Sequence, residues 1–121
     1  MLQNNLFTLA NLQTAGNTIT ANVQLNPAHT IFEGHFPGQP VLPGVCMMQM
    51  VKEVLESTLS KPTRLVRADD LKFLSVIVPQ PDKVIRIELT THTDGASIKT
   101  DARLLDGYTV LFKFKGTFVE Q

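Results

Sequence analysis

One histidine of this chain lies on a constrained loop that leads into its strongest helical segment. Residues 32–45 read FEGHFPGQPVLPGV, so that His35 is surrounded by three glycines and three prolines. A backbone with so little freedom is costly to build unless it has to hold a side chain still. Imidazole takes up and returns protons near neutral pH. The loop therefore favours proton transfer by His35 over the alternative, a structural histidine that caps a backbone carbonyl.

Two polar side chains of the following helical segment are further candidates for chemistry. Gln49 lies within an apolar run, where it either lines a site or satisfies a buried backbone group. Glu53 follows at i+4, on the same helix face. Glu53 either acts as an acid or lies at a solvated end of the helix, and the mixed composition beyond residue 52 favours the solvated end.

The other cysteine and histidine residues do not form a pattern typical of a metal site. His29 and His35 have the spacing H-x5-H, and the chain has a single cysteine, Cys46. Zinc sites need a second pair of ligands at characteristic spacing. A small core residue is the favoured role for Cys46, over a nucleophile paired with His35. His29 and His92 are expected to be exposed residues of a turn or a strand edge.

Length and composition limit the classes of protein to be considered. The chain has 121 residues, with 11 Lys and Arg against 11 Asp and Glu. We expect one domain, residues 1–121. A zero formal charge argues against a nucleic-acid partner, which requires a basic excess. The N-terminal residues lack the features of a signal peptide, and no segment is apolar enough to span a membrane. With one cysteine, a reduced cytoplasmic location is expected.

Most of the chain has the alternating pattern of half-buried strands. Candidate strands lie at residues 4–11, 18–25, 64–78, 83–92, 97–105 and 108–119, with a bulge expected near Asp69 and Asp70. The helix is predicted to begin at Pro43 and to end near Ser60, and its first two turns are apolar almost all round. A helix of that kind has to be enclosed. The pattern predicts an α+β hotdog fold, with a curved antiparallel sheet of about six strands around one central helix.

Three segments carry a resemblance to a known family. Residues 34–38 (GHFPG) and 40–45 (PVLPGV), followed by the apolar helix, resemble the beta-hydroxyacyl-acyl carrier protein dehydratases. Residues 70–79 (DLKFLSVIVP) are similar to the strand that follows the central helix in that family. The resemblance extends over nearly the whole chain.

The resemblance implies removal of water from a 3-hydroxyacyl thioester to give the trans-2-enoyl product. His35 matches the family's base, and Gly44 its backbone donor to the enolate oxygen, while Phe36 and Val45 are expected at the substrate. The implied partners are acyl carrier protein or an acyl-CoA thioester, and a second hotdog chain in a homodimer, a heterodimer or a higher oligomer. No cofactor, metal, nucleic acid or membrane is implied.

Gln49 departs from the family pattern, because it occupies the position of the carboxylic acid that protonates the departing hydroxyl. An amide has no proton to give. Three interpretations follow. The homodimer is a weak dehydratase in which His35 shuttles the proton, or the chain pairs with a homologue that has kept its carboxylate, or it is a thioesterase or a non-catalytic acyl-thioester binding subunit. The His35 loop favours the first two.

Two groups of side chains are candidates for contact with the acyl carrier and its acyl chain. The methionines of the helix suit a wall that accepts a flexible acyl chain, although ordinary core packing explains them as well. Acyl carrier proteins are acidic, so a basic surface is expected at the mouth of the site. The candidate contributors are Lys61, Arg64, Arg67 and Lys72.

Overall fold

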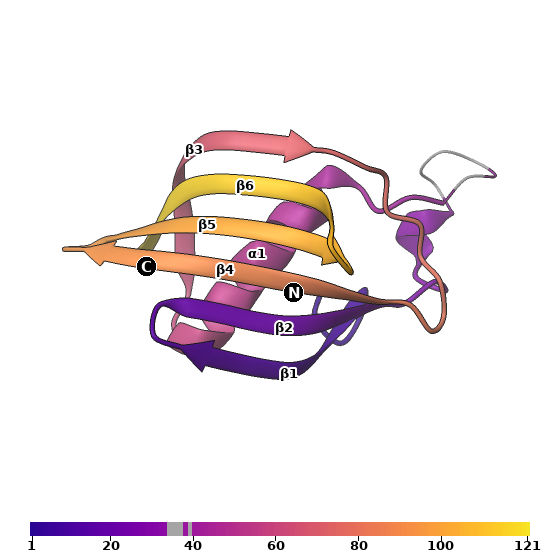
Figure 1. Ribbon diagram of the computed structural model, residues 1–121, viewed down its shortest axis with the longest axis horizontal. Coiled ribbons are helices and arrows are strands. Elements are labelled where there is room, and N and C mark those ends of the chain that lie inside the picture. Colours follow the sequence, from indigo (N-terminus) through magenta and orange to yellow (C-terminus); the bar gives the residue numbers. More distant parts are fainter. Residues whose placement is uncertain (34–37, 39) are drawn as a thin grey trace.

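The computed structural model describes residues 1–33, 38 and 40–121 and shows one sheet and one long helix (Figure 1). The strands are β1 (Phe7–Ala15), β2 (Thr18–Leu25), β3 (Thr63–Phe73), β4 (Val84–Asp94), β5 (Ser97–Asp106) and β6 (Thr109–Glu120). The helices are the short 3₁₀ helix η1 (Thr30–Phe32) and the α-helix α1 (Gly44–Leu59).

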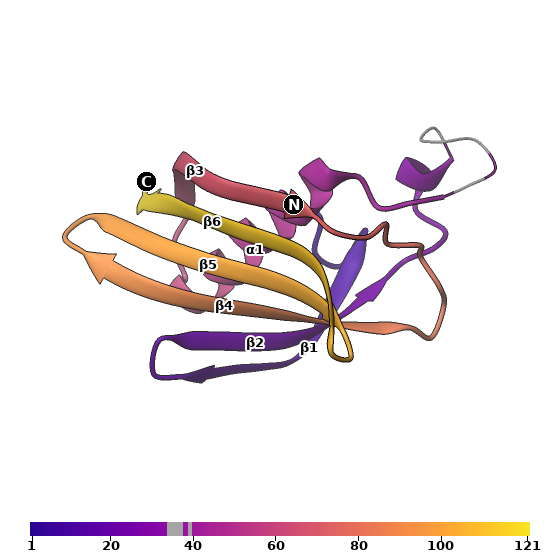
Figure 2. The same ribbon diagram turned by 45° about the horizontal axis from the view of Figure 1, so that its top comes forward.

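All strand pairs are antiparallel, and the order across the sheet is β1-β2-β4-β5-β6-β3. The two views show that the sheet curves and that α1 lies against one face of it (Figures 1 and 2). The strand that follows α1, β3, leaves the helix and returns to the far edge of the sheet. This arrangement confirms the predicted hotdog fold.

The alternating pattern of the sequence determines which side chains face the helix. Ile19, Ala21 and Val23 of β2 are buried, and so are the corresponding residues of β4, β5 and β6. They pack with Met50, Val51, Val54 and Leu55 of α1 into one apolar core. Burial of each large apolar side chain contributes about 1.5–3 kcal/mol, and this gain holds the helix against the sheet.

The ends of α1 differ slightly from the prediction. Pro43 is the N-cap, with φ −64° and ψ 147°, and Gly44 is the first helical residue. The extended ψ of Pro43 keeps it outside the helix, although its carbonyl oxygen accepts hydrogen bonds from the N–H groups of Cys46 and Met47. Leu59 is the last helical residue, and Ser60 follows in the left-handed conformation, with φ 56°.

β3 is shorter than predicted and has the expected irregularity. Its pairing with β6 shifts register between Ala68 and Asp70, as predicted near Asp69, and also between Leu65 and Arg67. The strand ends at Phe73 and not near residue 78. Its pairing ends there because the N–H groups of Leu74 and Ser75 both bond to the carbonyl oxygen of Leu111, and the chain turns away from β6.

The N-terminal strand was predicted too early in the chain. Residues 4–11 were expected, but β1 spans Phe7–Ala15. Leu6 is fully buried. β1 has an irregularity between Ala10 and Gln13, where Asn11 adopts a φ of 54°. That irregularity hides the strand from a reading of simple alternation.

Candidate functional site

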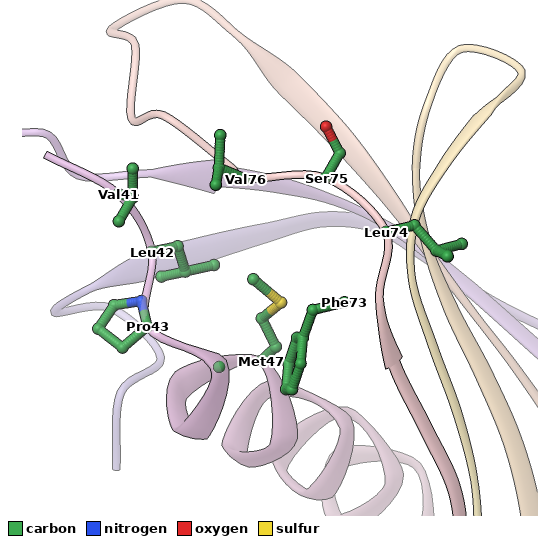
Figure 3. Close-up of a pocket in the computed structure, with 9 residues that line it drawn as sticks. Val41, Leu42, Pro43, Met47, Phe73, Leu74, Ser75 and Val76 are labelled. Atoms are coloured by element: carbon green, nitrogen blue, oxygen red, sulfur yellow. The ribbon is translucent and has the colours of Figure 1, made fainter. Parts of the chain in front are cut away.

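An apolar pocket of about 570 Å³ lies at the N-terminus of α1 (Figure 3). One wall is the chain entering the helix, and the other is the end of β3 with the segment that follows it. In Figure 3 the side chain of Met47 and the ring of Phe73 lie between these two walls. The pocket is lined by Val41, Leu42, Pro43, Gly44, Met47, Phe73, Leu74, Ser75 and Val76.

Backbone hydrogen bonds hold the two walls in place. The N–H of Leu42 donates to the carbonyl oxygen of Ile77 at 2.7 Å, which joins the segment before α1 to the segment after β3. Leu74 is fixed in turn by its bond to Leu111 of β6 at 3.0 Å. Segments far apart in the sequence therefore form a pocket of defined width next to the first turn of the helix.

The start of α1 provides hydrogen-bond donors at this pocket. The N–H groups of Gly44 and Val45 precede the first intrahelical bonds, and neither has a backbone partner among the described residues. The helix dipole adds partial positive charge at the same end. Donors of this kind stabilise a carbonyl oxygen that gains negative charge, and the donor role of Gly44 stays a prediction.

The ring of Phe73 lies against Gly44. A β-carbon on Gly44 would be 2.6 Å from Cζ and 2.8 Å from Cε1 of Phe73, closer than real contacts of this kind. The ring also stacks on Phe112, with centroids 5.3 Å apart. Phe73 was not among the predicted site residues. Its position within residues 70–79, one of the segments that carry the resemblance, was the available signal.

The structure describes only some of the predicted site residues. His35 and Phe36 lie outside the described residues. Gly44 lines the pocket, whereas Val45 is 75% exposed and does not line it. Gln49 is half-buried on α1 and is not part of the pocket lining either.

Gln49 and Glu53 form a hydrogen-bonded pair, and the prediction of a solvated Glu53 was wrong. The side-chain Nε2 of Gln49 donates to Oε2 of Glu53 at 2.9 Å, and Glu53 is 0% exposed. The carboxylate also accepts the N–H groups of Leu2 and Gln3. These backbone donors compensate for the loss of water around a buried charge. They come from the N-terminus, 50 and 51 positions away in the sequence, so the local sequence does not predict them.

The environment of Cys46 favours a structural role. The side chain is only 6% exposed, and burial raises the pKa of its thiol. A thiol that stays protonated is a poor nucleophile. The structure therefore supports the predicted core position of Cys46.

The expected basic surface is largely neutralised by acidic neighbours. Lys61 lies 3.5 Å from Glu120, Lys72 lies 3.9 Å from Asp70, and Arg67 pairs with Asp69. Charges paired in this way give a weak field, so these residues do not form a strong docking surface for an acidic carrier.

The remaining histidines have ordinary surroundings. His29 is half-buried and its Nδ1 accepts the N–H of Ile31, which caps η1. His92 is exposed on β4, an interior strand of the sheet and not an edge strand. Within the described part of the chain, no three Asp, Glu, His or Cys side chains come close enough to hold a metal ion. No described helix is long and apolar enough to cross a membrane.

Comparison with known proteins places these features in a family. The family model of the ApeI-like proteins, described as ApeI dehydratase, matches residues 11–104. A 3-hydroxyacyl-[acyl-carrier-protein] dehydratase FabZ from Anaeromyxobacter sp. (strain K) is 32% identical over 89 residues, which cover 65% of this chain and 57% of that protein. The chain thus matches little more than half the length of this relative.

Two solved structures share the fold. The dehydratase heterocomplex ApeI:P from Xenorhabdus doucetiae has a TM-score of 0.70 and 21% identity, over 88% of this chain and 91% of that one. A mutant of the thioesterase PA1618 from Pseudomonas aeruginosa has a TM-score of 0.65 and 15% identity, over 95% and 82%. At these identities the similarity establishes the fold alone. The family model, in contrast, covers most of the chain, and on that ground the protein belongs to the ApeI-like dehydratase family.

Proposed function

We propose that this chain is a subunit of a dehydratase that acts on 3-hydroxyacyl thioesters. The reaction removes a proton from the carbon next to the thioester and breaks the bond between the third carbon and its hydroxyl oxygen. The hydroxide leaves with a proton as water, and the trans-2-enoyl thioester remains. The observation that carries this proposal is the family match over residues 11–104, which includes the His35 loop, Gly44 and Gln49.

His35 and Gly44 have separate roles in this proposal. His35 takes the proton from the carbon next to the thioester, because imidazole is basic enough near neutral pH. The enolate oxygen that develops is stabilised by the N–H of Gly44 at the positive end of α1. The apolar pocket next to Gly44 supports this assignment, because exclusion of water strengthens such a hydrogen bond.

The third role is protonation of the leaving hydroxyl, for which there are two arrangements. Gln49 cannot act as an acid, so either His35 returns its proton to the leaving hydroxide, or a related chain supplies a carboxylic acid. We favour the second arrangement, a mixed dimer in which each site combines residues from both chains. The solved structure of ApeI:P, which shares the fold and is described as a dehydratase heterocomplex, supports this choice.

An exposed apolar surface supports a second hotdog chain as the partner. Leu71 and Phe73 pair with the buried Phe114 and Phe112 of β6, so they point to the helix side of the sheet. They nevertheless remain 42% and 51% exposed, because β3 is an edge strand that α1 covers only in part. Val45 on the first turn of the helix is exposed as well. An edge strand beside an apolar face of this kind is suited to pairing with a second sheet.

The proposal is tested by assaying the chain alone and co-expressed with a related hotdog chain that carries a carboxylate at the position of Gln49. The substrates are a 3-hydroxyacyl thioester and the saturated thioester of the same length, on coenzyme A and on acyl carrier protein. We expect enoyl product from the mixed complex and a loss of about 10²-fold or more in the His35→Ala variant. Absence of enoyl product in every combination, with both chains folded, contradicts the proposal.

A thioesterase is the second candidate, and Gln49 is the observation that favours it. A side-chain amide can hold the water that attacks a thioester carbonyl. The same assay separates the two candidates, because only a thioesterase releases free thiol from the saturated substrate. Binding of both thioesters without turnover would instead identify a non-catalytic binding subunit.

A further inference from the structure

We propose that Glu53 is a positioning residue that fixes the side-chain amide of Gln49 so that its carbonyl oxygen is the atom available to a ligand. This inference rests on the proposed function, which places Gln49 at the acyl-thioester site. It adds an orientation to that assignment, and the orientation determines which chemical group Gln49 recognises.

Several hydrogen bonds fix the buried carboxylate of Glu53. Glu53 is 0% exposed, and its two oxygens accept bonds from three groups. The N–H of Leu2 lies 2.9 Å from Oε2, the N–H of Gln3 lies 2.8 Å from Oε1, and Nε2 of Gln49 lies 2.9 Å from Oε2. Bonds to a charged acceptor are stronger than those between neutral groups, so the carboxylate is firmly held.

The carboxylate of Glu53 determines the orientation of the Gln49 amide. An ionised carboxylate only accepts hydrogen bonds, so the NH₂ group of Gln49 has to face it. With the carbonyl oxygen turned toward Glu53 instead, two acceptors would be in contact and the bond would be lost. The charge on Glu53 therefore selects one of the two amide orientations. Oε1 of Gln49, which accepts no hydrogen bond from a residue that the structure describes, is the atom that faces a ligand.

The orientation of the Gln49 amide determines which group of a ligand it can bind. A free acceptor pairs with a donor, and on an acyl thioester of this class the donor is the 3-hydroxyl group. The same oxygen would hold a water in the thioesterase alternative. Gln49 then recognises the hydroxyl group without giving or taking a proton, and it distinguishes a 3-hydroxyacyl chain from a saturated one. Sites that pair with a substrate hydroxyl reject the analogue that lacks it, because a polar group is left unpaired.

Replacement of Glu53 by glutamine should reverse this orientation. Oε1 of Glu53 lies within reach of both backbone donors, 3.1 Å from the N–H of Leu2 and 2.8 Å from that of Gln3. The new amide therefore places its oxygen at that position and its NH₂ group at the position of Oε2, which faces Gln49. Gln49 then has to present its oxygen to that NH₂ group and its own NH₂ group to the ligand. Side-chain size and the hydrogen bond between positions 49 and 53 are retained, the bond from Leu2 to Oε2 is lost, and the atom offered to the ligand changes.

The binding experiment compares 3-hydroxyoctanoyl-CoA with octanoyl-CoA, by calorimetry on the complex with the partner chain. In the native protein we expect tighter binding of the hydroxylated ligand. In the Glu53→Gln variant we expect this preference to fall about tenfold, with octanoyl-CoA affinity unchanged. Lys52→Gln is the matched control, because it makes a change of one charge on the adjacent helix position, and its preference should stay as in the native protein. An unchanged preference in Glu53→Gln overturns the inference.

A stability experiment tests the pair independently of any ligand. Gln49→Glu brings two carboxyl groups into contact, so its folding equilibrium constant at pH 8 should fall about tenfold or more. In the double variant Gln49→Glu/Glu53→Gln, one carboxylate again faces one amide, so most of that loss should be recovered. Effects of the two changes that simply add contradict the pairing. If Glu53→Gln does not fold alone, the comparison of Gln49→Glu with the double variant still decides the question.

The two experiments separate failure of this inference from failure of the proposed function. Recovery of stability in the double variant, with no binding of either thioester by the native complex, would support the Gln49–Glu53 pair and refute the acyl-thioester site. Thioester binding and turnover with no coupling between the two positions would support the proposed function and refute the role of Glu53.

Discussion

The ring of Phe73 occupies the space that a side chain on Gly44 would need. The distance of 2.6 Å from an added β-carbon to Cζ of Phe73 leaves no room for even one methyl group. The ring and the helix N-terminus thus bring the two walls of the pocket into contact. Gly44 is required by this contact with a residue of β3, since a helix by itself would accept alanine at its first position.

Gly44→Ala should move the Phe73 ring and reduce activity more than stability. Overpacking costs about 1–3 kcal/mol, and the higher helix propensity of alanine returns part of that. We expect a net loss of about 1 kcal/mol in urea unfolding and a loss of thioester turnover of about tenfold or more, because the donor wall is displaced.

The matched control for this prediction is Gly44→Ala/Phe73→Leu. A smaller side chain at position 73 removes the clash, so the double variant should recover stability relative to the sum of the two single changes. Strictly additive effects would show that the ring does not contact the helix start in solution.

The sequence predicted the fold well because the fold depends on local alternation. Ile19, Ala21 and Val23 show the period of a half-buried strand, and the buried pattern of β2 follows from it. Gly44 was predicted from the motif, and it lies at the N-terminus of α1 as expected. Two of the errors arose where a residue's environment is set by distant parts of the chain.

Glu53 is the clearest of these errors. Its neighbours along α1 include Lys52 and Glu56, which suggested a solvated face. Its actual partners are the backbone N–H groups of Leu2 and Gln3, about fifty positions earlier. No local pattern encodes that contact. The early end of β3 has a similar origin, because it depends on the carbonyl oxygen of Leu111.

Leu71→Lys should weaken association with a second hotdog chain. Leu71 faces the helix side of the edge strand β3 and is 42% exposed, so a partner that covers this surface would bury the new charge. We expect the dissociation constant of the dimer to rise about 100-fold, measured by light scattering after size-exclusion chromatography. The free energy of unfolding of the isolated chain should change by less than about 0.5 kcal/mol.

Leu12→Lys is the control for this edge. Leu12 is also 42% exposed, but it lies on β1 at the opposite edge of the sheet. Association should stay unchanged in this variant. Loss of the dimer in Leu12→Lys and not in Leu71→Lys would place the interface on β1.

Cys46 should react slowly with alkylating reagents in the folded protein. Burial keeps its thiol protonated by raising the pKa, and iodoacetamide reacts with the thiolate. At pH 8 we expect alkylation roughly 100-fold slower than in the chain unfolded by guanidinium, followed by mass spectrometry. A Ser75→Cys/Cys46→Ala variant, with its thiol at the pocket wall, should react quickly. Rapid labelling of Cys46 itself would show that α1 opens in the native state.

Gln49→Glu places a carboxylic acid at the position that we assign to the family's acid, and Glu53 makes the effect of this change depend on pH. The two carboxyl groups would be in contact in the folded variant and, with the backbone donors of Leu2 and Gln3 on Glu53, they would share one proton. The unfolded chain releases that proton at an ordinary carboxyl pKa of about 4.3. The folded variant then binds more protons than the unfolded chain, so its stability falls as the pH rises above that value.

The native protein lacks this additional loss of stability at high pH, and so should the double variant with Glu53→Gln. Urea unfolding at pH 5, 6.5 and 8 measures the slope, and parallel curves for all three proteins would contradict the pairing. Dehydration should be faster in the double variant Gln49→Glu/Glu53→Gln than in Gln49→Glu, because a carboxyl group held by an amide has a defined position from which to protonate the hydroxyl.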